Sequence, residues 1–163
     1  DQTAANIVGV FADREHFYET ITMYDRRTGD QAAISEVFVS PQELYWDLPA
    51  VVLINGNTVS SGEGMAMMLD RLGIPTVGFE GTAASFGSAG STIALPGGWE
   101  LSYPAGRSLD IDGVIQLDSD HTLTGGVQPS HRVPWTAENL TAHAADPDGF
   151  LIDHAVEHVL GGW

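Results

Sequence analysis

Hydrophobic and polar positions divide the middle of the chain into short, regular blocks. Residues 50–54 (AVVLI) are a continuous apolar run between turn residues, which is typical of a strand buried on both faces. After this run, Met65, Met68, Leu69 and Leu72 recur at the spacing of one helix face. The pattern therefore predicts a strand followed by an amphipathic helix.

The end of this helix and the next apolar run complete a larger unit. Gly73 and Pro75 are the usual signals for the end of a helix, and residues 76–79 (TVGF) read as another strand. A strand, a helix and a strand within about 30 residues predict a βαβ unit with a right-handed crossover.

Two other regions have the pattern of β-hairpins. Residues 21–24 and 36–39 are β-rich and flank the polar stretch DRRTGDQ. Residues 91–96 and 99–104 are separated by the Gly-Gly turn at 97–98. A loop of small residues precedes this second hairpin.

The last third of the chain is less regular. Residues 105–135 predict irregular structure with one or two short strands, while residues 148–160 carry an apolar stripe at helical spacing, with Asp146 or Asp148 near its start. No internal repeat is visible. At 163 residues, we expect residues 1–163 to form a single α/β domain with a mixed sheet and flanking helices.

Composition narrows the range of functions. Hydrophobic residues make up 43% of the chain, mean hydropathy is −0.01, and no apolar run approaches the ~18 residues of a membrane span. The net charge of −16 disfavours nucleic acid and anionic membranes as partners. All six basic residues are arginines, so no lysine of this chain can act as a general base. The absence of cysteine excludes disulfides and thiolate chemistry.

The stretch VVLINGNTVSSGEG at 51–64 places two serines between the first predicted strand and the helix. Ser60 and Glu63 have the Ser-x-x-Glu spacing of a capping box, which by itself needs no catalytic role. A serine at a helix N-terminus also lies where N–H groups and the helix dipole stabilise an oxyanion. Both interpretations place the hydroxyl at the same point.

The segment at 51–82 resembles the active-site segment of the S41 serine peptidases, which include the tail-specific processing proteases and the tricorn core proteases. The family has an aliphatic strand, an Asn-rich turn, Ser-Ser-Gly-Glu, a helix, and a strand ending in Gly-Glu-x-Thr. The resemblance continues through YPAGRS at 103–108 and GGVQPS at 125–130, and it covers roughly residues 34–135.

This resemblance implies a crotonase-like α/β core, with Ser60 as nucleophile and the Ser61 N–H in the oxyanion hole. It assigns Gly62, Glu63 and Ser85 to the oxyanion and substrate loops, and it implies a periplasmic or extracellular location. No basic and apolar signal segment is visible at the start of the sequence. By the same resemblance, the chain is expected to lack the family's upstream Arg-x-Asn-x-Gly-Gly segment and its PDZ domain.

The general base is the main departure from the family. Tail-specific proteases use a lysine about 25 residues after the serine, and that position falls near Ser85 here. Tricorn-type members use an upstream histidine, which His16 does not match convincingly. Within the chain, the sequence LDSDH brings Asp118, Asp120 and His121 into one loop, so His121 is a candidate base with either aspartate as its orienting acid. The alternative is that DSD is only an Asx-rich turn.

No cofactor is expected. His154 and His158 are four residues apart on the last predicted helix, but no third metal ligand is apparent.

The leading hypothesis is a serine hydrolase that cleaves peptides or simple carboxylic esters through an acyl-enzyme on Ser60. The alternatives are a non-catalytic domain that binds a peptide or builds an assembly, and half of a larger protease whose base comes from another segment or subunit. A homo-oligomer is open under each of these hypotheses.

Overall fold

The computed structural model describes residues 2–117, 126–157 and 161. Helices and strands in this part occur in the order α1 (Gln2–Val8), a 3-10 turn η1 (Gly9–Phe11), β1 (His16–Asp25), β2 (Asp30–Val39), β3 (Val52–Leu53), α2 (Ser61–Arg71), β4 (Thr76–Gly78), β5 (Ser88–Ala94), β6 (Glu100–Leu109), β7 (His131–Arg132), α3 (Ala137–Ala145) and α4 (Pro147–Ala155).

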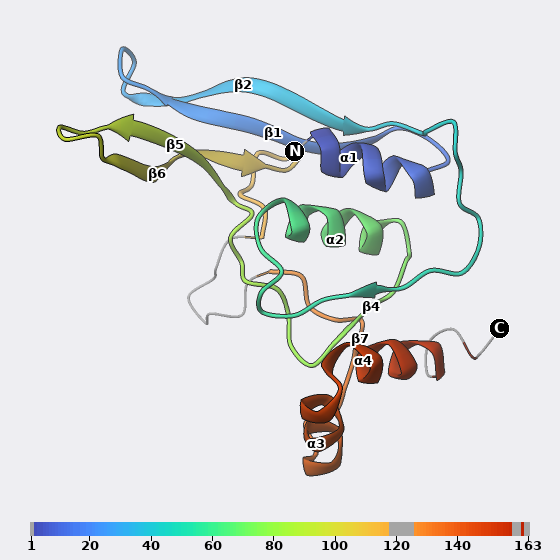
Figure 1. Cartoon of the computed structure of the whole chain (residues 1–163). Helices are drawn as coiled ribbons and strands as arrows, with labels where there is room; N and C mark the ends of the chain where they lie inside the picture. Colours follow the sequence, from blue (N-terminus) through green and yellow to red (C-terminus); the bar gives the residue numbers. More distant parts are fainter. Residues whose placement is uncertain (1, 118–125, 158–160, 162–163) are drawn as a thin grey trace.

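The chain has the predicted α/β composition, but its described strands do not form one mixed sheet. Four long strands make an antiparallel sheet in the order β2-β1-β6-β5, and three short ones make a parallel sheet in the order β3-β4-β7. Figure 1 shows α2 between the two sheets. The physical reason for the separation is that α2 needs apolar cover on two sides, and each sheet supplies one of them.

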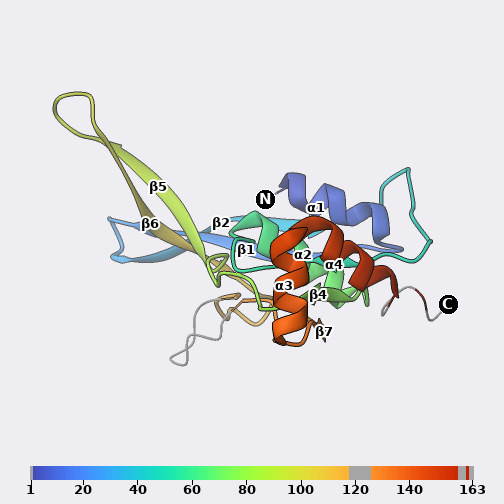
Figure 2. The same ribbon diagram turned by 60° about the horizontal axis from the view of Figure 1, so that its bottom comes forward.

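Both predicted hairpins are present and are longer than their sequence patterns indicated. β1 and β2 pair from His16 with Val39 to Asp25 with Asp30, and β5 and β6 pair from Ser88 with Arg107 to Ala94 with Glu100. β1 and β6 join them in the centre of the antiparallel sheet. Figures 1 and 2 show the two hairpins extending well beyond the helices.

The predicted βαβ unit is formed by β3, α2 and β4, with β3 and β4 parallel. β3 is only two residues long, and Leu53 is 38% exposed, so the expectation of a longer strand buried on both faces was wrong. β4 is fully buried, and Gly73 follows α2 with φ +86°. Helices often end at a residue with positive φ, and glycine adopts this conformation at little cost because it has no Cβ.

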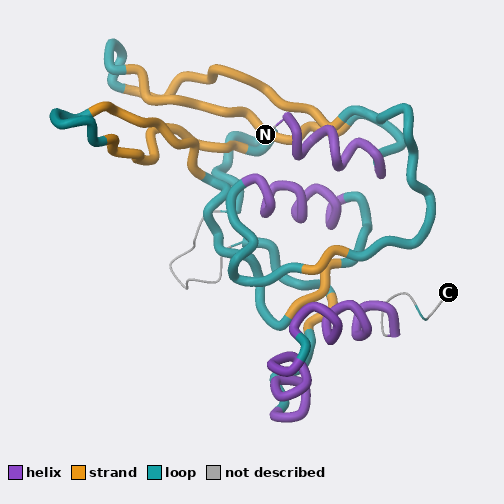
Figure 3. Tube along the Cα trace, viewed as in Figure 1, coloured by secondary structure: helices purple, strands orange, loops and turns teal. Residues whose placement is uncertain are grey.

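The buried side chains form two clusters on either side of the parallel sheet. The larger one joins α1, α2 and the antiparallel sheet, and it includes Val8, Tyr18 and Met68. The smaller one joins the parallel sheet and α4 through Val77, Val133 and Leu151. Figure 3 shows how much of the remaining chain is loop. No helix in the described part of the chain has the length and apolar character needed to cross a bilayer.

Candidate active site

Ser60 lies immediately before α2 in an unusual backbone conformation. Its φ is +53° and its ψ is −125°, a region that residues with a Cβ rarely occupy. The residue is exposed, although the helix that follows it is largely buried. In α/β-hydrolases, the nucleophilic serine lies on a strained turn between a strand and a helix.

The buried carboxylate of Glu63 holds this turn in place. Its Oε2 accepts a hydrogen bond from the Ser60 N–H at 3.0 Å, so Glu63 forms its half of the expected capping box. The same oxygen accepts from the Ser85 N–H and from the Ser85 hydroxyl, both at 2.7 Å. Oε1 accepts from the Thr82 hydroxyl and from the Ala84 N–H, both at 2.6 Å.

Two strained residues therefore share one acceptor group. Ala84, like Ser60, has a positive φ, at +60°, and both donate their N–H to the Glu63 carboxylate. Glu63 is completely buried. The Glu63 carboxyl group thus joins the turn before α2 to the loop after β4.

The electrostatic state of Glu63 follows from these donors. Burial alone would raise the pKa of Glu63, but the hydrogen bonds from Thr82, Ser85 and Ala84 outweigh it and lower the pKa overall. The group is therefore a carboxylate at neutral pH with its lone pairs already engaged. This arrangement makes Glu63 a support for the turn and a poor general base.

Ser85 occupies the position where the sequence placed the family's lysine, and the structure brings it beside Ser60. Its Oγ donates to Glu63 and accepts from the Ser60 N–H at 3.0 Å. A neutral hydroxyl is a much weaker base than a lysine amine, so Ser85 is a poor acceptor for the proton of another serine. Ser85 thus fills the place of the missing base without its chemistry.

The GGVQPS segment contributes to the same network. The Thr82 hydroxyl, which donates to Glu63, accepts from the Val127 N–H at 2.8 Å, and Thr82 N–H donates to the Val127 carbonyl at 3.0 Å. This second layer was not visible in the sequence, because Thr82 and Val127 are 45 residues apart.

Gly62 and Gly64 have different roles in the first turn of α2. A side chain at Gly64 would collide with the Tyr18 hydroxyl and with the Phe86 ring, whereas a side chain at Gly62 would meet only the Thr58 methyl at 3.6 Å. Gly64 allows the helix start to lie directly on the antiparallel sheet. Gly62 donates its N–H to the Val59 carbonyl at 3.0 Å.

The predicted base and the predicted histidine pair lie apart from the described site or outside the described residues. Asp118, Asp120, His121 and His158 lie outside the described residues. His143 and His154 are packed against aromatic rings of the smaller core cluster, at centroid distances of 5.1 Å to Phe79 and 6.1 Å to Phe150. Among the residues that the structure describes, no three histidine or acidic side chains are grouped as metal ligands.

Comparisons with known proteins identify the family of the chain. A model of peptidase family S41 matches residues 1–132, which is most of the chain. The chain belongs to peptidase family S41. This family match begins further towards the N-terminus than the segment that the motifs indicated.

Solved structures similar to this S41 chain include a candidate peptidase from Parabacteroides merdae (TM-score 0.66, 22% identity, 94% of this chain and 46% of that chain). The photosystem II D1 C-terminal processing protease has a TM-score of 0.54 and 20% identity, covering 80% of this chain and 30% of that one. Mature CPAF in complex with lactacystin has a TM-score of 0.64 and 13% identity, covering 96% and 42%. A search of curated protein sequences found no match.

This S41 chain spans less than half the length of each of these three structures. The identities are low enough that the structural likeness supports the fold alone.

Proposed function

We propose that this chain is a serine peptidase of S41 type in which Ser60 is the nucleophile. The observation that carries the proposal is the position of Ser60 at the start of α2. Ser60 is exposed, has a positive φ and is fixed by the buried Glu63 carboxylate. The buried Glu63 carboxylate fixes the backbone of the exposed Ser60. A nucleophile that must meet its substrate in one orientation needs such a fixed position.

In the proposed reaction, the Ser60 Oγ attacks the carbonyl carbon of a peptide bond while its proton passes to a general base. The tetrahedral oxyanion then expels the amine, which takes the proton, and water hydrolyses the resulting acyl-enzyme. The N-terminus of the 11-residue helix α2 lies next to the forming negative charge. We assign the Ser61 N–H to the oxyanion hole and the overall core to the crotonase-like type.

The base is proposed to be His121, oriented by Asp118 or Asp120. Support comes from Leu117 and Val127, the described residues on either side of this stretch of sequence. Val127 belongs to the core cluster that contains α2, and Leu117 packs against this cluster. The Val127 N–H also donates a hydrogen bond to the Thr82 hydroxyl, which bonds to Glu63. The competing source is another segment or subunit, because the chain spans less than half of its structural relatives.

A small hollow beside Ser61 is suited to one substrate side chain. It measures about 370 Å³ and lies between α1 and the first turn of α2, lined by Thr3, Ala4, Ile7, Ser61, Gly62 and Met65. Its mostly apolar lining favours a small aliphatic side chain. Such a site fits a peptide better than a minimal ester, so we place peptides ahead of esters as substrates.

The test is turnover of casein and of p-nitrophenyl acetate by the purified chain and three variants. Ser60→Ala should lower both rates by about a thousandfold or more, because the nucleophile is lost. Ser61→Ala should retain activity, because its proposed role uses the backbone N–H. His121→Ala separates the two sources of the base: loss of activity supports an internal base, and unchanged activity assigns the base elsewhere.

Two outcomes would favour the other hypotheses. A folded wild type that turns over neither substrate favours a non-catalytic peptide-binding or assembly domain. Cleavage of the ester but not of casein identifies an esterase.

A further inference from the structure

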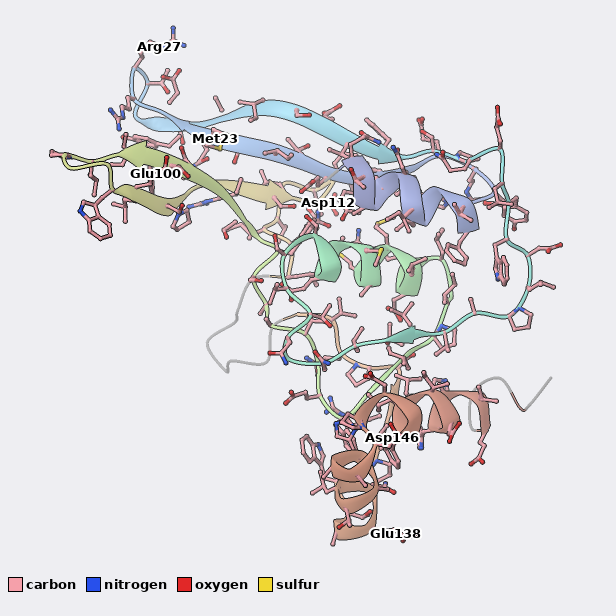
Figure 4. The ribbon with its side chains drawn as sticks, in the orientation of Figure 1. Met23, Arg27, Glu100, Asp112, Glu138 and Asp146 are labelled. Atoms are coloured by element: carbon pink, nitrogen blue, oxygen red, sulfur yellow. The ribbon has the colours of Figure 1, made fainter. Side chains whose placement is uncertain are left out.

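The two hairpins enclose a hollow at the point where they separate. β1 pairs with β6 only from Thr20 with Leu109 to Met23 with Gly106. Beyond Met23 the hairpins diverge, and Figure 4 shows Met23 on β1 at the side that faces the β5–β6 hairpin. The space between them, here called the hairpin hollow, measures about 640 Å³. It is larger than the hollow beside Ser61.

The charge lining the hairpin hollow is opposite to that of the whole protein. Arg26 and Arg107 both line it, and none of the acidic residues in the described part of the chain does, although the full sequence has 22 Asp and Glu. Neither guanidinium forms an ion pair or a hydrogen bond with any described residue. By contrast, the neighbouring Arg27 is paired with Asp25 at 3.0 Å. Two unpaired cations at one hollow of a protein with net charge −16 indicate an anionic ligand.

Other features of the hairpin hollow suit an extended peptide. Tyr24, Gln31, Ser91 and Tyr103 add polar side-chain groups to its lining. β6 pairs with β5 over residues 100–107 but with β1 only over residues 106–109. The edge of β6 that faces β1 is therefore unpaired over residues 100–105, and an extended segment can hydrogen-bond to such an edge.

The hairpin hollow is also close to Ser60 along the chain. Gly87 and Ser88 line it, and Ser85, three residues before Ser88, bonds to the Ser60 N–H at 3.0 Å. Three residues span at most about 10 Å. A peptide bound at Ser60 can thus place a group a few residues away in the hollow.

We propose that the hairpin hollow binds a carboxylate of the peptide substrate through Arg26 and Arg107. This inference rests on the proposed peptidase function and specifies its substrate. A guanidinium binds a carboxylate through paired N–H donors, which gives both affinity and orientation. The carboxylate comes either from an Asp or Glu side chain or from the C-terminal end of the substrate, and the test separates these sources.

The test is an NMR titration of ¹⁵N-labelled Ser60→Ala protein, which binds substrate without cleaving it. Three acetylated octapeptides of Ala and Ser are compared: one with a central Asp and an amidated end, one neutral with a free C-terminal carboxylate, and one neutral and amidated. At least one carboxylate-bearing peptide should bind about tenfold more tightly than the neutral one. It should shift the amide signals of Gly87, Ser88 and Gly106.

The variants for this titration are Arg107→Gln and Arg26→Gln, each of which should remove most of the preference. Arg14→Gln is the matched control, because Arg14 is exposed, has no partner among the described residues and does not line the hollow. Long-range repulsion alone would make the acidic peptides bind more weakly than the neutral one, since the protein has a net charge of −16. Equal binding of all three peptides, or an equal loss in Arg14→Gln, would overturn the proposal.

This result is independent of whether Ser60 is catalytic. Selective binding with an inactive wild type would reject the peptidase function while retaining the carboxylate site. Turnover by the wild type without selective binding would reject the carboxylate site alone.

Discussion

At the scale of single residues, the pKa values of two buried glutamates of this fold are shifted in opposite directions. Glu63 and Glu19 are both almost inaccessible to solvent. Glu63 has hydrogen-bond donors on both oxygens, whereas Glu19 has one described partner, the Ser108 hydroxyl at 2.6 Å, and its other oxygen has none. Burial without enough donors favours the neutral acid, and burial with many donors favours the ion.

Glu63→Gln tests the support of the Ser60 turn. The variant replaces an acceptor oxygen with an NH₂ group that faces N–H donors, so we expect a loss of about 2–4 kcal/mol in unfolding free energy and a large loss of activity. Urea unfolding measures the first and casein turnover the second. Asp70→Asn, an exposed position on the same helix, is the control and should change neither.

The same comparison has a definite pH dependence. Since the pKa of Glu63 is lowered in the folded state, its contribution is complete above the unfolded pKa of about 4.3 and is lost as the pH falls through the folded value. The stability difference between the wild type and Glu63→Gln should therefore shrink below about pH 4. A difference that stays constant from pH 7 to pH 3 would contradict the charged state assigned to Glu63.

Glu19→Gln should show the opposite trend. Burial raises the pKa of Glu19, although the Ser108 hydrogen bond opposes the shift. A raised folded pKa stabilises the protein fully below the unfolded pKa, and this stabilisation is lost as the pH rises through the folded value. Glu19→Gln should thus resemble the wild type near pH 4 and become more stable than it towards pH 8. Thermal unfolding of both proteins at pH 4 and pH 8 measures this difference in stability. If the variant loses stability relative to the wild type between pH 4 and pH 8, the raised pKa of Glu19 is contradicted.

At the scale of elements, the start of α2 is set by close packing on the antiparallel sheet. Tyr18 and Glu19 are consecutive on β1 and both buried, because a register irregularity lies between Phe17 and Glu19. Tyr18 therefore faces Gly64 and Phe86, with its ring 5.7 Å from that of Phe86 in an edge-on arrangement. Burial also raises the pKa of Tyr18, so its hydroxyl stays protonated and does not compete as a base.

A matched pair of glycine variants tests this packing. Gly64→Ala should lower the unfolding free energy by about 1–3 kcal/mol, because the methyl group overlaps with Tyr18 and Phe86. Gly62→Ala lies on the same helix turn without such neighbours, so it should be neutral or stabilise the protein by about 0.5–1 kcal/mol through helix propensity. Equal effects of the two variants in chemical unfolding would show that Gly64 is not a packing contact.

Elements with a strong local period could be predicted, and those that depend on distant partners could not. The hairpins, the helix α2 and the helix α4 followed from periodicity and turn residues. α1 is seven residues long and buries Ala4, Ala5 and Val8 in the core shared with α2, so its stability comes from tertiary contacts. α3 has no buried residue, so packing on the core does not explain its position. Its start does have a local signal in the sequence, because Thr136 is an N-cap residue whose hydroxyl accepts from the Asn139 N–H.

The candidate site divides in the same way. The Ser60 and Glu63 spacing indicated the turn before the helix, because a capping box is a local pattern. The partners that make Glu63 an ion, Thr82, Ala84 and Ser85, follow it by about 20 residues and are placed only by the βαβ crossover. Arg26 and Arg107 line the same hollow only because β1 pairs with β6.

At the scale of the whole molecule, a strongly acidic chain of peptidase family S41 spans less than half the length of its structural relatives. The rigid turn, the helix N-terminus and the two hollows lie within this span. We propose that groups of this chain alone make the Ser60 hydroxyl reactive.

The most direct test of this claim is covalent labelling with a fluorophosphonate, followed by mass spectrometry of the intact protein and its peptides. An activated serine displaces fluoride from phosphorus, whereas an ordinary surface serine does not. We expect one adduct per chain, on Ser60, and none on folded Ser60→Ala. A folded wild type that remains unlabelled, or that is labelled at another serine, would contradict this claim.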